Sequence, residues 1–244
     1  MKILVTNDDG IHAEGLKIIA EELGREHEVL IFAPDQERSG VSHAMSLKSP
    51  GKVRQQGSNS WSCSGTPADC VILARLGALP FAADLVVSGI NRGPNLGTDI
   101  VYSGTCGAAR QASIHGMPAI AVSCASFHDP MMYRGAASFV RRHLKGLVGA
   151  CAPGTFININ APSTDSEDLE GRWAFPSRRR YLDRLKSFEG PDGFSYCFLS
   201  ETTIETVSEN DSDHDVVSRG EVSISAIIVN PQASVVSPFG ARWS

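Results

Sequence analysis

Two adjacent carboxylates, Asp8 and Asp9, directly follow an apolar stretch at residues 3–5. An apolar run without alternation is typical of a strand buried on both faces of a parallel sheet, and ligands bind where such strands end. Neighbouring carboxylates repel each other unless a cation or a shared proton offsets the repulsion, and a divalent cation does so. The pair therefore indicates a metal site. A turn is an equally good interpretation of these residues alone, because Asn-Asp-Asp-Gly is good turn chemistry and Asp9 can cap a helix.

Two polar loops follow later predicted strands. Residues 33–43 contain hydroxyl groups, an arginine and a glycine, Gly40, which permits close backbone approach, although this composition is also typical of an ordinary polar loop. Residues 88–99 contain three glycines together with Asn91 and Asn95. The second loop can fold around an anion, and its carboxamide oxygens are available to a metal. It contains neither the dinucleotide fingerprint G-x-G-x-x-G nor a Walker pattern.

The start of a predicted helix at residues 104–115 is a further candidate site. The free amide groups of a first helical turn and the positive end of the helix dipole attract anions. Ser103 is also a good N-cap, and the structural and anion-binding interpretations are compatible. Taken together, two carboxylates, a carboxamide, hydroxyl groups and a helix start are what metal-assisted phosphate chemistry requires.

Alternating strands and helices over the first 160 residues must position these groups. The expected strands cover residues 2–5, 29–33, 85–88, 119–123 and 156–159. The expected helices cover residues 14–23, 67–76 with Thr66 as N-cap, 104–115 and 131–148. This alternation predicts an α/β fold with a doubly wound, Rossmann-like, mainly parallel sheet and right-handed crossovers.

Two stretches interrupt the alternation. Residues 44–64 contain short strand-like pieces among serine, glycine and glutamine, and we expect a hairpin excursion from the sheet there. Beyond Pro162 the chain is polar, and strand-like pieces flank a strong turn at residues 190–193. We therefore expect an α/β catalytic core at residues 1–162 and a C-terminal antiparallel β-hairpin appendage at residues 163–244 that is not an independent domain.

Composition narrows the function class. The chain has 244 residues, of which 42% are hydrophobic, and a net charge of -5 without an evident basic face. Because phosphate neutralisation dominates affinity for duplex nucleic acid, we expect no such partner. No apolar run approaches the roughly 20 residues that span a bilayer, and no signal-peptide pattern is present, so we expect no membrane partner and a cytoplasmic location. The six scattered cysteines are expected to be free thiols.

Five short segments occur together and in order. They are N-D-D-G at residues 7–10, E-R-S-G at 37–40, G-T-P-A-D-C at 65–70, S-G-I-N-R-G-P-N at 88–95 and Y-S-G-T at 102–105. In this combination the chain resembles the SurE family (survival protein E) of 5'/3'-nucleotidases, closely over residues 1–160 and loosely beyond. The resemblance implies a metal-dependent phosphomonoesterase that hydrolyses nucleoside 5'- and 3'-monophosphates to nucleoside and phosphate, with short polyphosphate as a further substrate.

The resemblance also implies roles for individual residues. One divalent ion per subunit, Mg²⁺ or Mn²⁺, is held by the residues that match Asp8, Asp9, Ser39 and Asn91. We expect Asp8 and Asp9 to be the catalytic residues as well. Contacts to phosphate are expected from Ser39, Gly40, Asn95, Ser103, Gly104 and Thr105. The family further implies a homodimer or homotetramer in which subunits exchange parts of the C-terminal region.

Two alternatives belong to other classes. A receiver-type signalling domain also places an acidic pair after its first strand, but it requires an aspartate after the third strand and a lysine after a later one. This chain has Asn91 and the pair Ser123 and Cys124 at those places. A non-catalytic nucleotide-binding module has less reason to place two carboxylates against a phosphate. An enzyme is therefore the better expectation.

Overall fold

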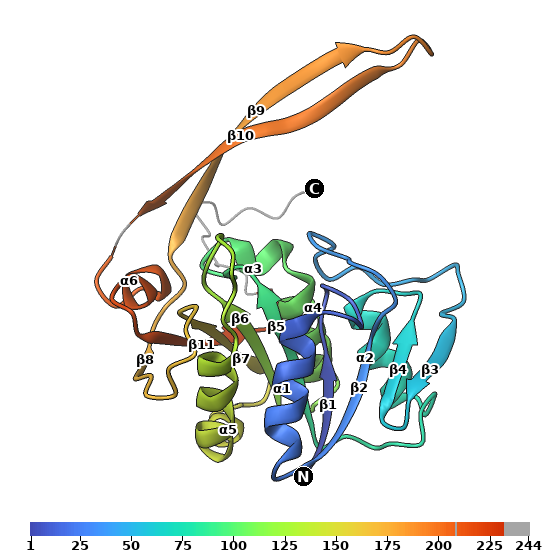
Figure 1. Cartoon of the computed structure of the whole chain (residues 1–244), viewed down its shortest axis with the longest axis vertical. Coiled ribbons are helices and arrows are strands. Elements are labelled where there is room, and N and C mark those ends of the chain that lie inside the picture. The colour runs from blue at the N-terminus through green and yellow to red at the C-terminus, as the bar shows by residue number, and fades with distance from the viewer. Residues whose placement is uncertain (208, 232–244) are drawn as a thin grey trace, which may run out of the picture.

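A central β-sheet carries helices on both of its faces in the computed structural model, which describes residues 1–207 and 209–231 (Figure 1). The strands of this sheet are β1 (Lys2–Thr6), β2 (Glu28–Pro34), β3 (Val53–Gly57), β4 (Ser60–Cys63), β5 (Leu85–Arg92), β6 (Ala119–Cys124), β7 (Thr155–Ala161), β8 (Gly171–Trp173) and β11 (Val222–Ile228). Their order across the sheet is β3-β4-β2-β1-β5-β6-β7-β11-β8. The described helices are α1 (Glu14–Gly24), α2 (Pro67–Arg75), α3 (Asp99–Tyr102), α4 (Gly104–Ile114), α5 (Arg134–Gly149) and α6 (Asp213–Ser218).

The five central strands β2, β1, β5, β6 and β7 are parallel, as the alternation of elements predicts. Strand β1 lies inside the sheet, and its residues Ile3, Leu4 and Val5 are all buried. Because alternate side chains point to opposite faces, both faces of this strand are covered. The predicted α/β fold with a mainly parallel sheet is confirmed.

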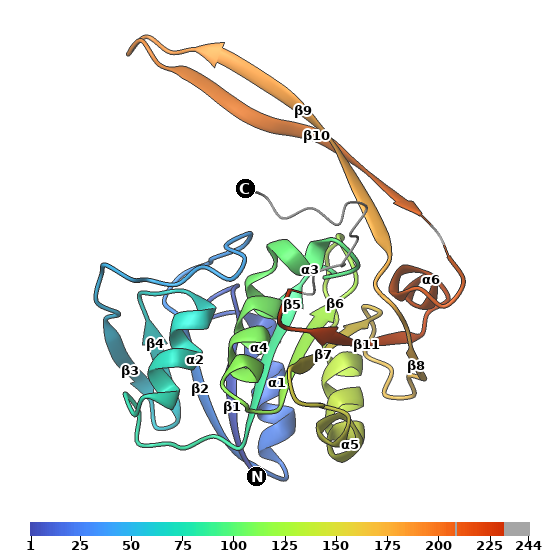
Figure 2. The same ribbon diagram turned by 180° about the vertical axis from the view of Figure 1, so that it is seen from behind.

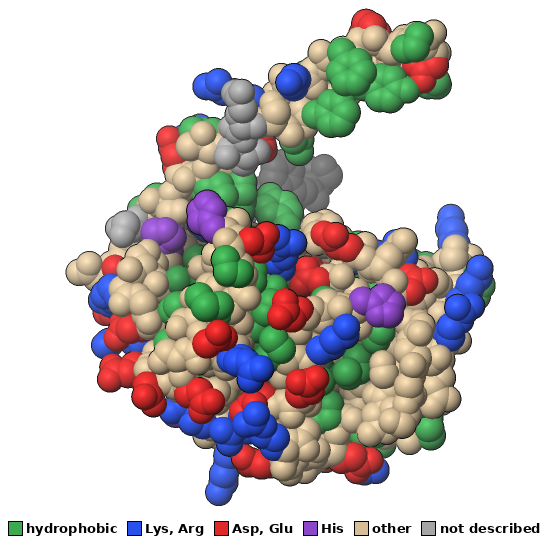
Figure 3. Space-filling model, in the orientation of Figure 1, with side chains coloured by type: hydrophobic (Ala, Val, Ile, Leu, Met, Phe, Trp, Pro, Cys, Tyr) green, Lys and Arg blue, Asp and Glu red, His purple; other side chains and the backbone are tan. Residues whose placement is uncertain are grey.

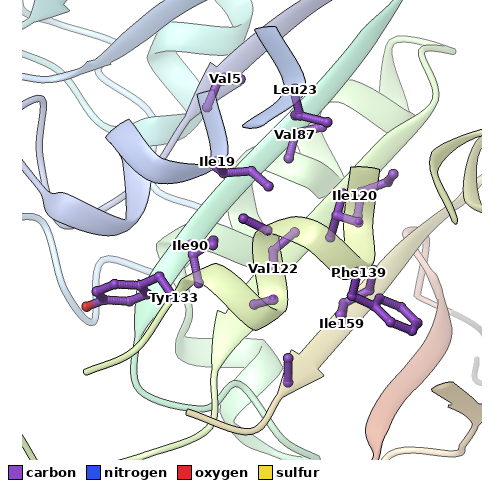
Figure 4. Packing of buried hydrophobic residues seen from close by; sticks show 14 of the residues in the cluster. Val5, Ile19, Leu23, Val87, Ile90, Ile120, Val122, Tyr133, Phe139 and Ile159 are labelled. Carbon is purple, nitrogen blue, oxygen red and sulfur yellow. The ribbon is translucent and has the colours of Figure 1, made fainter. Parts of the chain in front are cut away.

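Helices α1 and α5 cover one face of the sheet. Ile19 and Leu23 of α1 and Phe139 of α5 belong to the same buried cluster as Val5 and Val87 of the sheet (Figure 4). The other face is covered by α2 and α4, as the reverse view shows (Figure 2). Because the helices cover the two faces of the sheet, the carboxyl ends of the parallel strands lie at one edge of the core. The loops that follow β1, β2 and β5 meet at this edge.

The predicted cap of α2 is confirmed. The side chain of Thr66 accepts a hydrogen bond from the backbone N–H of Asp69 at 3.1 Å, and the carboxylate of Asp69 accepts one from the backbone N–H of Thr66 at 2.9 Å. This reciprocal pair satisfies two amides that the helix itself leaves without partners. The carboxylate of Asp69 also accepts hydrogen bonds from the backbone and hydroxyl of Ser46, so the cap holds the loop before β3 as well.

Residues 44–64 extend the sheet rather than leaving it, which differs from the expected excursion. Strands β3 and β4 form an antiparallel pair, and β4 pairs in parallel with β2. Without β4 the outer edge of β2 would leave amide and carbonyl groups unpaired, and pairing with β4 satisfies these groups. The hairpin is therefore the outer part of the main sheet.

The chain beyond residue 162 also returns to the main sheet. Strand β11 pairs antiparallel with β7 and parallel with β8, so the sheet extends past the expected boundary of the core. Local patterns cannot show this pairing, because it depends on the edge that β7 leaves open. Projecting hairpin structure is confined to β9 (Arg178–Glu189) and β10 (Ser195–Val207). Residues 232–244 of the expected C-terminal region lie outside the described residues.

The β9–β10 hairpin projects far from the core as a two-stranded ribbon joined by the expected turn at residues 190–193 (Figures 1 and 2). It carries large apolar side chains in solvent, among which Leu185 is 70% and Leu199 is 78% exposed. An isolated two-stranded ribbon is marginally stable in water.

Among residues 1–207 and 209–231 no helix is long and apolar enough to cross a membrane. All six cysteines are free thiols, as expected.

Candidate active site

Three elements bring polar groups together at the carboxyl end of the sheet. Asp8 follows β1 and is only 3% exposed. Its carboxylate accepts a hydrogen bond from the hydroxyl of Thr105, which is fully buried in the first turn of α4. The same hydroxyl lies 3.4 Å from the side-chain oxygen of Asn91 on β5. Asp8, Thr105 and Asn91 therefore form one cluster, although they come from three separate parts of the chain.

The turn interpretation of residues 7–10 is confirmed. The side chain of Asn7 donates to the carbonyl of Gly10 at 3.0 Å and accepts from its amide at 3.2 Å. Gly10 has φ +97°, and a Cβ there would lie 3.1 Å from the backbone of Gln36. This position thus requires glycine for both conformation and space. The tight turn presents Asp8 and Asp9 at the end of β1.

Asp8 lies directly against the start of α4. A Cβ added to Gly104 would lie 2.8 Å from the Cβ of Asp8 and 2.9 Å from its Oδ2, so only glycine leaves room for the carboxylate. Burial raises the pKa of Asp8 above its usual range. The Thr105 hydroxyl and the backbone amides of Gly104 and Thr105 oppose this rise. The start of α4 thus stabilises negative charge at this point.

Asp9 is partly buried, and its carboxylate accepts a hydrogen bond from the backbone N–H of Arg92 at 3.1 Å. Burial raises the pKa of Asp9 to about 6, and the negative charges of Asp8 and Glu37 contribute to this rise. Ionising both carboxylates therefore costs more than usual without a positive charge between them. A cation at the pair would remove this penalty.

The donor atoms fit a hard divalent cation. In the described part of the chain, no group of three or more His, Cys, Asp and Glu side chains is arranged to hold a metal ion. A cation at Asp8 and Asp9 must therefore take its other ligands from neutral oxygens, such as the carboxamide of Asn91 or water. Oxygen-only coordination suits Mg²⁺ or Mn²⁺ and is poor for zinc, which prefers nitrogen and sulfur.

The loop after β2 lies beside the acidic pair. The backbone N–H of Arg38 donates to the carbonyl of Asp8 at 2.6 Å, and the amide of Ser42 donates to the carbonyl of Tyr102 at 2.9 Å. Ser39 and Gly40 lie between these two anchors, and Gly40 has φ +70°. The hydroxyl of Ser39 is exposed and donates to Glu37 at 2.8 Å. The structure thus places Ser39 near the pair but does not bring its hydroxyl into contact with it.

Asn95 and Ser103, both expected at the phosphate, have structural partners. The amide of the Asn95 side chain donates to the hydroxyl of Ser123 at 2.8 Å, and its backbone carbonyl accepts from Asn158 and Asn160. These bonds tie the loop after β5 to the ends of β6 and β7. Ser103 accepts from the amide of Cys106 at 3.0 Å and caps α4. Its capping role is confirmed.

A carboxylate that the sequence does not single out holds the loop after β5 in place. Asp213, at the start of α6, is fully buried. Its carboxylate accepts from the amides of Gly97 at 2.7 Å and Ser177 at 2.8 Å. A capping pattern marks this short helix, since Ser212 accepts from the amide of Asp215. No local pattern, however, reveals a partner 116 residues away.

A cleft of about 640 Å³ opens next to Asp9. It is lined by Asp9, Ala13, Glu14, Glu37, Arg92, Asp129, Pro130, Met131 and Tyr133. Arg92 and Asp129 form an ion pair of 2.6 Å at this cleft. Burial raises the pKa of Tyr133 to about 12, so its hydroxyl keeps its proton at neutral pH. On this side of the molecule acidic and basic side chains are interspersed, without a broad basic patch (Figure 3).

Comparisons with known proteins identify relatives of this chain. A family model described as survival protein SurE matches residues 3–183. A protein from Kosmotoga olearia named 5'-nucleotidase SurE is 43% identical over 93% of this chain and 92% of its own length. A protein of the same name from Geotalea uraniireducens is 41% identical over 93% and 92%. The crystal structure of the SurE protein from Aquifex aeolicus is similar with a TM-score of 0.81 and 31% identity, over 95% of both chains.

Proposed function

Because this chain belongs to the survival protein SurE family, we propose that it is a nucleotidase that releases phosphate from nucleoside monophosphates. The observation that carries the proposal is the contact between the buried carboxylate of Asp8 and the first turn of α4. A carboxylate pair that favours a cation thus adjoins amides that favour an anion. A metal ion and a phosphate group can bind side by side at such a site.

In the proposed mechanism Asp8, Asp9 and Asn91 would hold one divalent ion, Mg²⁺ or Mn²⁺. Ser39, whose hydroxyl now donates to Glu37, would complete this set. When bound, the ion supplies a Lewis acid for a phosphoryl oxygen and neutralises charge that develops on it. The two carboxylates accept hydrogen bonds from the attacking water, which orients the water and favours loss of its proton.

The start of α4 binds the phosphate in this proposal. The amides of Gly104 and Thr105 lie against the carboxylate of Asp8, and the loop amide at Gly40 lies on the neighbouring segment. Asn95 holds the loop after β5 in place, and Ser103 caps α4. The backbone of both residues can contribute to the phosphate site. Only the phosphoryl group of the substrate contacts these amides, so both 5'- and 3'-monophosphates are proposed substrates. Short polyphosphate is a further proposed substrate, because it presents the same terminal group.

Phosphate release from AMP tests the proposed activity and its metal dependence. With EDTA the purified protein is expected to lose activity, and added Mn²⁺ or Mg²⁺ is expected to restore it. Full activity in EDTA after exhaustive dialysis would show that the reaction needs no metal ion. Absence of phosphate release with every metal would contradict the proposed nucleotidase activity.

The pH dependence of stability gives a readout of the metal that does not depend on activity. Because the pKa of Asp9 rises from 3.8 to about 6 in the folded protein, the metal-free folded state binds more protons than the unfolded state between these values. The free energy of unfolding is therefore expected to fall as the pH rises through that window. Saturating Mn²⁺ should abolish the fall and raise the melting temperature. Identical thermal unfolding curves in EDTA and in Mn²⁺ would contradict a cation at this pair.

We also propose that the β9–β10 hairpin binds a second copy of the chain, giving a homodimer or a pair of dimers. Leu185 and Leu199 are direct cross-strand partners and form part of the exposed apolar surface of the ribbon. Burying such a surface against another subunit removes apolar area from water. Sedimentation velocity should show an oligomer that the double variant Leu185→Ser, Leu199→Ser dissociates. The control Leu76→Ser, at an equally exposed leucine beyond α2, should leave the oligomer intact.

A further inference from the structure

Tyr133 has an unpartnered hydroxyl group although the residue is only 5% exposed. Its ring lies at the edge of the core cluster beside Ile90, and its oxygen points away from the labelled apolar side chains (Figure 4). Within the described residues this hydroxyl has no hydrogen-bond partner, and Tyr133 lines the cleft next to Asp9. The residue is buried as a whole, but its hydroxyl oxygen is open to the cleft. A tyrosine hydroxyl in this position is available to hydrogen-bond to a ligand that enters the cleft.

The cleft has the size and chemistry of a site for a polar organic ligand. A volume of about 640 Å³ lies within the range of small-molecule sites. Ala13, Pro130 and Met131 form an apolar part of its wall. Four carboxylates and one guanidinium also line it, so hydrogen-bond acceptors outnumber positive charges. Such a lining favours a ligand with several hydroxyl groups over a further anion, so short polyphosphate should be a poorer substrate than a nucleoside monophosphate.

We propose that this cleft is the nucleoside subsite and that the hydroxyl of Tyr133 hydrogen-bonds to the ribose of the substrate. The inference rests on the proposed nucleotidase function and extends it to the part of the substrate that does not react. In both 5'- and 3'-monophosphates the ribose is bonded directly to the phosphate, so it is the first group to extend past Asp9. Carboxylates such as Glu14 and Asp129 accept hydrogen bonds from ribose hydroxyls, as acidic residues do in dinucleotide sites.

The variant Tyr133→Phe tests the ribose contact with three substrates. AMP contains ribose and base, ribose 5-phosphate lacks the base, and p-nitrophenyl phosphate lacks both. Loss of one hydrogen bond should raise the KM for AMP and for ribose 5-phosphate about fivefold, with little change in kcat. The constants for p-nitrophenyl phosphate should not change. Because the ring remains in the core, the melting temperature serves as the control for folding.

Each other outcome overturns the assignment. Unchanged constants for AMP, or equal changes for all three substrates, would show that Tyr133 does not contact the sugar. A change for AMP without a change for ribose 5-phosphate would move the contact to the base. Should the wild type hydrolyse none of the substrates, the proposed function fails but the subsite is still tested, by calorimetric titration with adenosine. Equal binding of adenosine to the wild type and to Tyr133→Phe would then overturn the inference.

Glu14 tests the prediction that the cleft disfavours a second phosphate on the sugar. Adenosine 3',5'-bisphosphate should have a kcat/KM about tenfold or more below that of AMP, because the second phosphate meets the carboxylates of the cleft. Glu14→Gln should lower the ratio of kcat/KM for AMP to kcat/KM for the bisphosphate severalfold. Glu21→Gln, which removes a charge from an exposed position of the same helix, should leave the ratio as in the wild type. Equal ratios in the wild type and Glu14→Gln would contradict the role of this carboxylate.

Discussion

Asp8→Asn is expected to lower the rate of phosphate release from AMP by about a thousandfold while the protein stays folded. The substitution keeps the shape of the side chain and an oxygen that accepts from Thr105, but it removes the charge that faces the start of α4. The cation then loses a ligand, and the attacking water loses its acceptor. The rate of phosphate release and the melting temperature together measure both parts of the expectation.

Asp84→Asn is the matched control for this substitution. Asp84 lies before β5, at the opposite end of the sheet, and its carboxylate accepts from the backbone N–H of Lys2 at 2.7 Å. The control should retain the wild-type rate, because it removes one exposed aspartate charge without touching the candidate site. Near-wild-type turnover by the Asp8→Asn protein would disprove the proposed role of Asp8.

Gly104→Ala is expected to lower kcat/KM for AMP by about a hundredfold. The added Cβ would lie 2.8 Å from the Cβ of Asp8 and 3.0 Å from Cγ1 of Val41, so the carboxylate or the helix start must move. Displacing a catalytic group by about 1 Å can reduce the rate by about this factor. Steady-state kinetics with AMP measures the effect, and circular dichroism verifies that α4 is retained.

The control for this substitution is Gly146→Ala in α5. Gly146 is exposed, and an alanine Cβ there would have no described heavy atom within 4 Å outside the local helix. Alanine at this position should stabilise the protein by about 0.5–1 kcal/mol and leave kcat/KM unchanged, because it favours the helix without creating a contact. Wild-type kinetics in the Gly104→Ala protein would mean that the close approach of α4 to Asp8 is not needed for the reaction.

The sequence predicts those parts of the fold that local patterns determine. The apolar run at residues 3–5 identifies β1, and Thr66 with Asp69 identifies the start of α2. The acidic turn after β1 is also readable, because turn residues and carboxylates are adjacent in the chain. Parallel strands then place the loops that follow them at one edge of the sheet, so the neighbourhood of Asp8 and Asn91 follows from the topology.

Contacts between distant segments could not be predicted in the same way. Thr105 donates to Asp8 across 97 residues, and Asp213 binds the amide of Gly97 across 116. Such partners depend on how helices and edge strands pack, which no local pattern encodes. The return of β11 to the open edge of β7 has the same origin. Ser39 shows a further difference, since its hydroxyl binds Glu37 rather than joining the acidic pair.

We propose that a divalent cation and a phosphate bind side by side between the end of β1 and the start of α4. Anomalous diffraction from a crystal grown with Mn²⁺ and phosphate would locate both. We predict a manganese peak between the carboxylates of Asp8 and Asp9, with the Asn91 side-chain oxygen as a ligand and phosphate against the amides of Gly104 and Thr105. Manganese elsewhere on the protein, with none at this carboxylate pair, would contradict a shared metal and phosphate site.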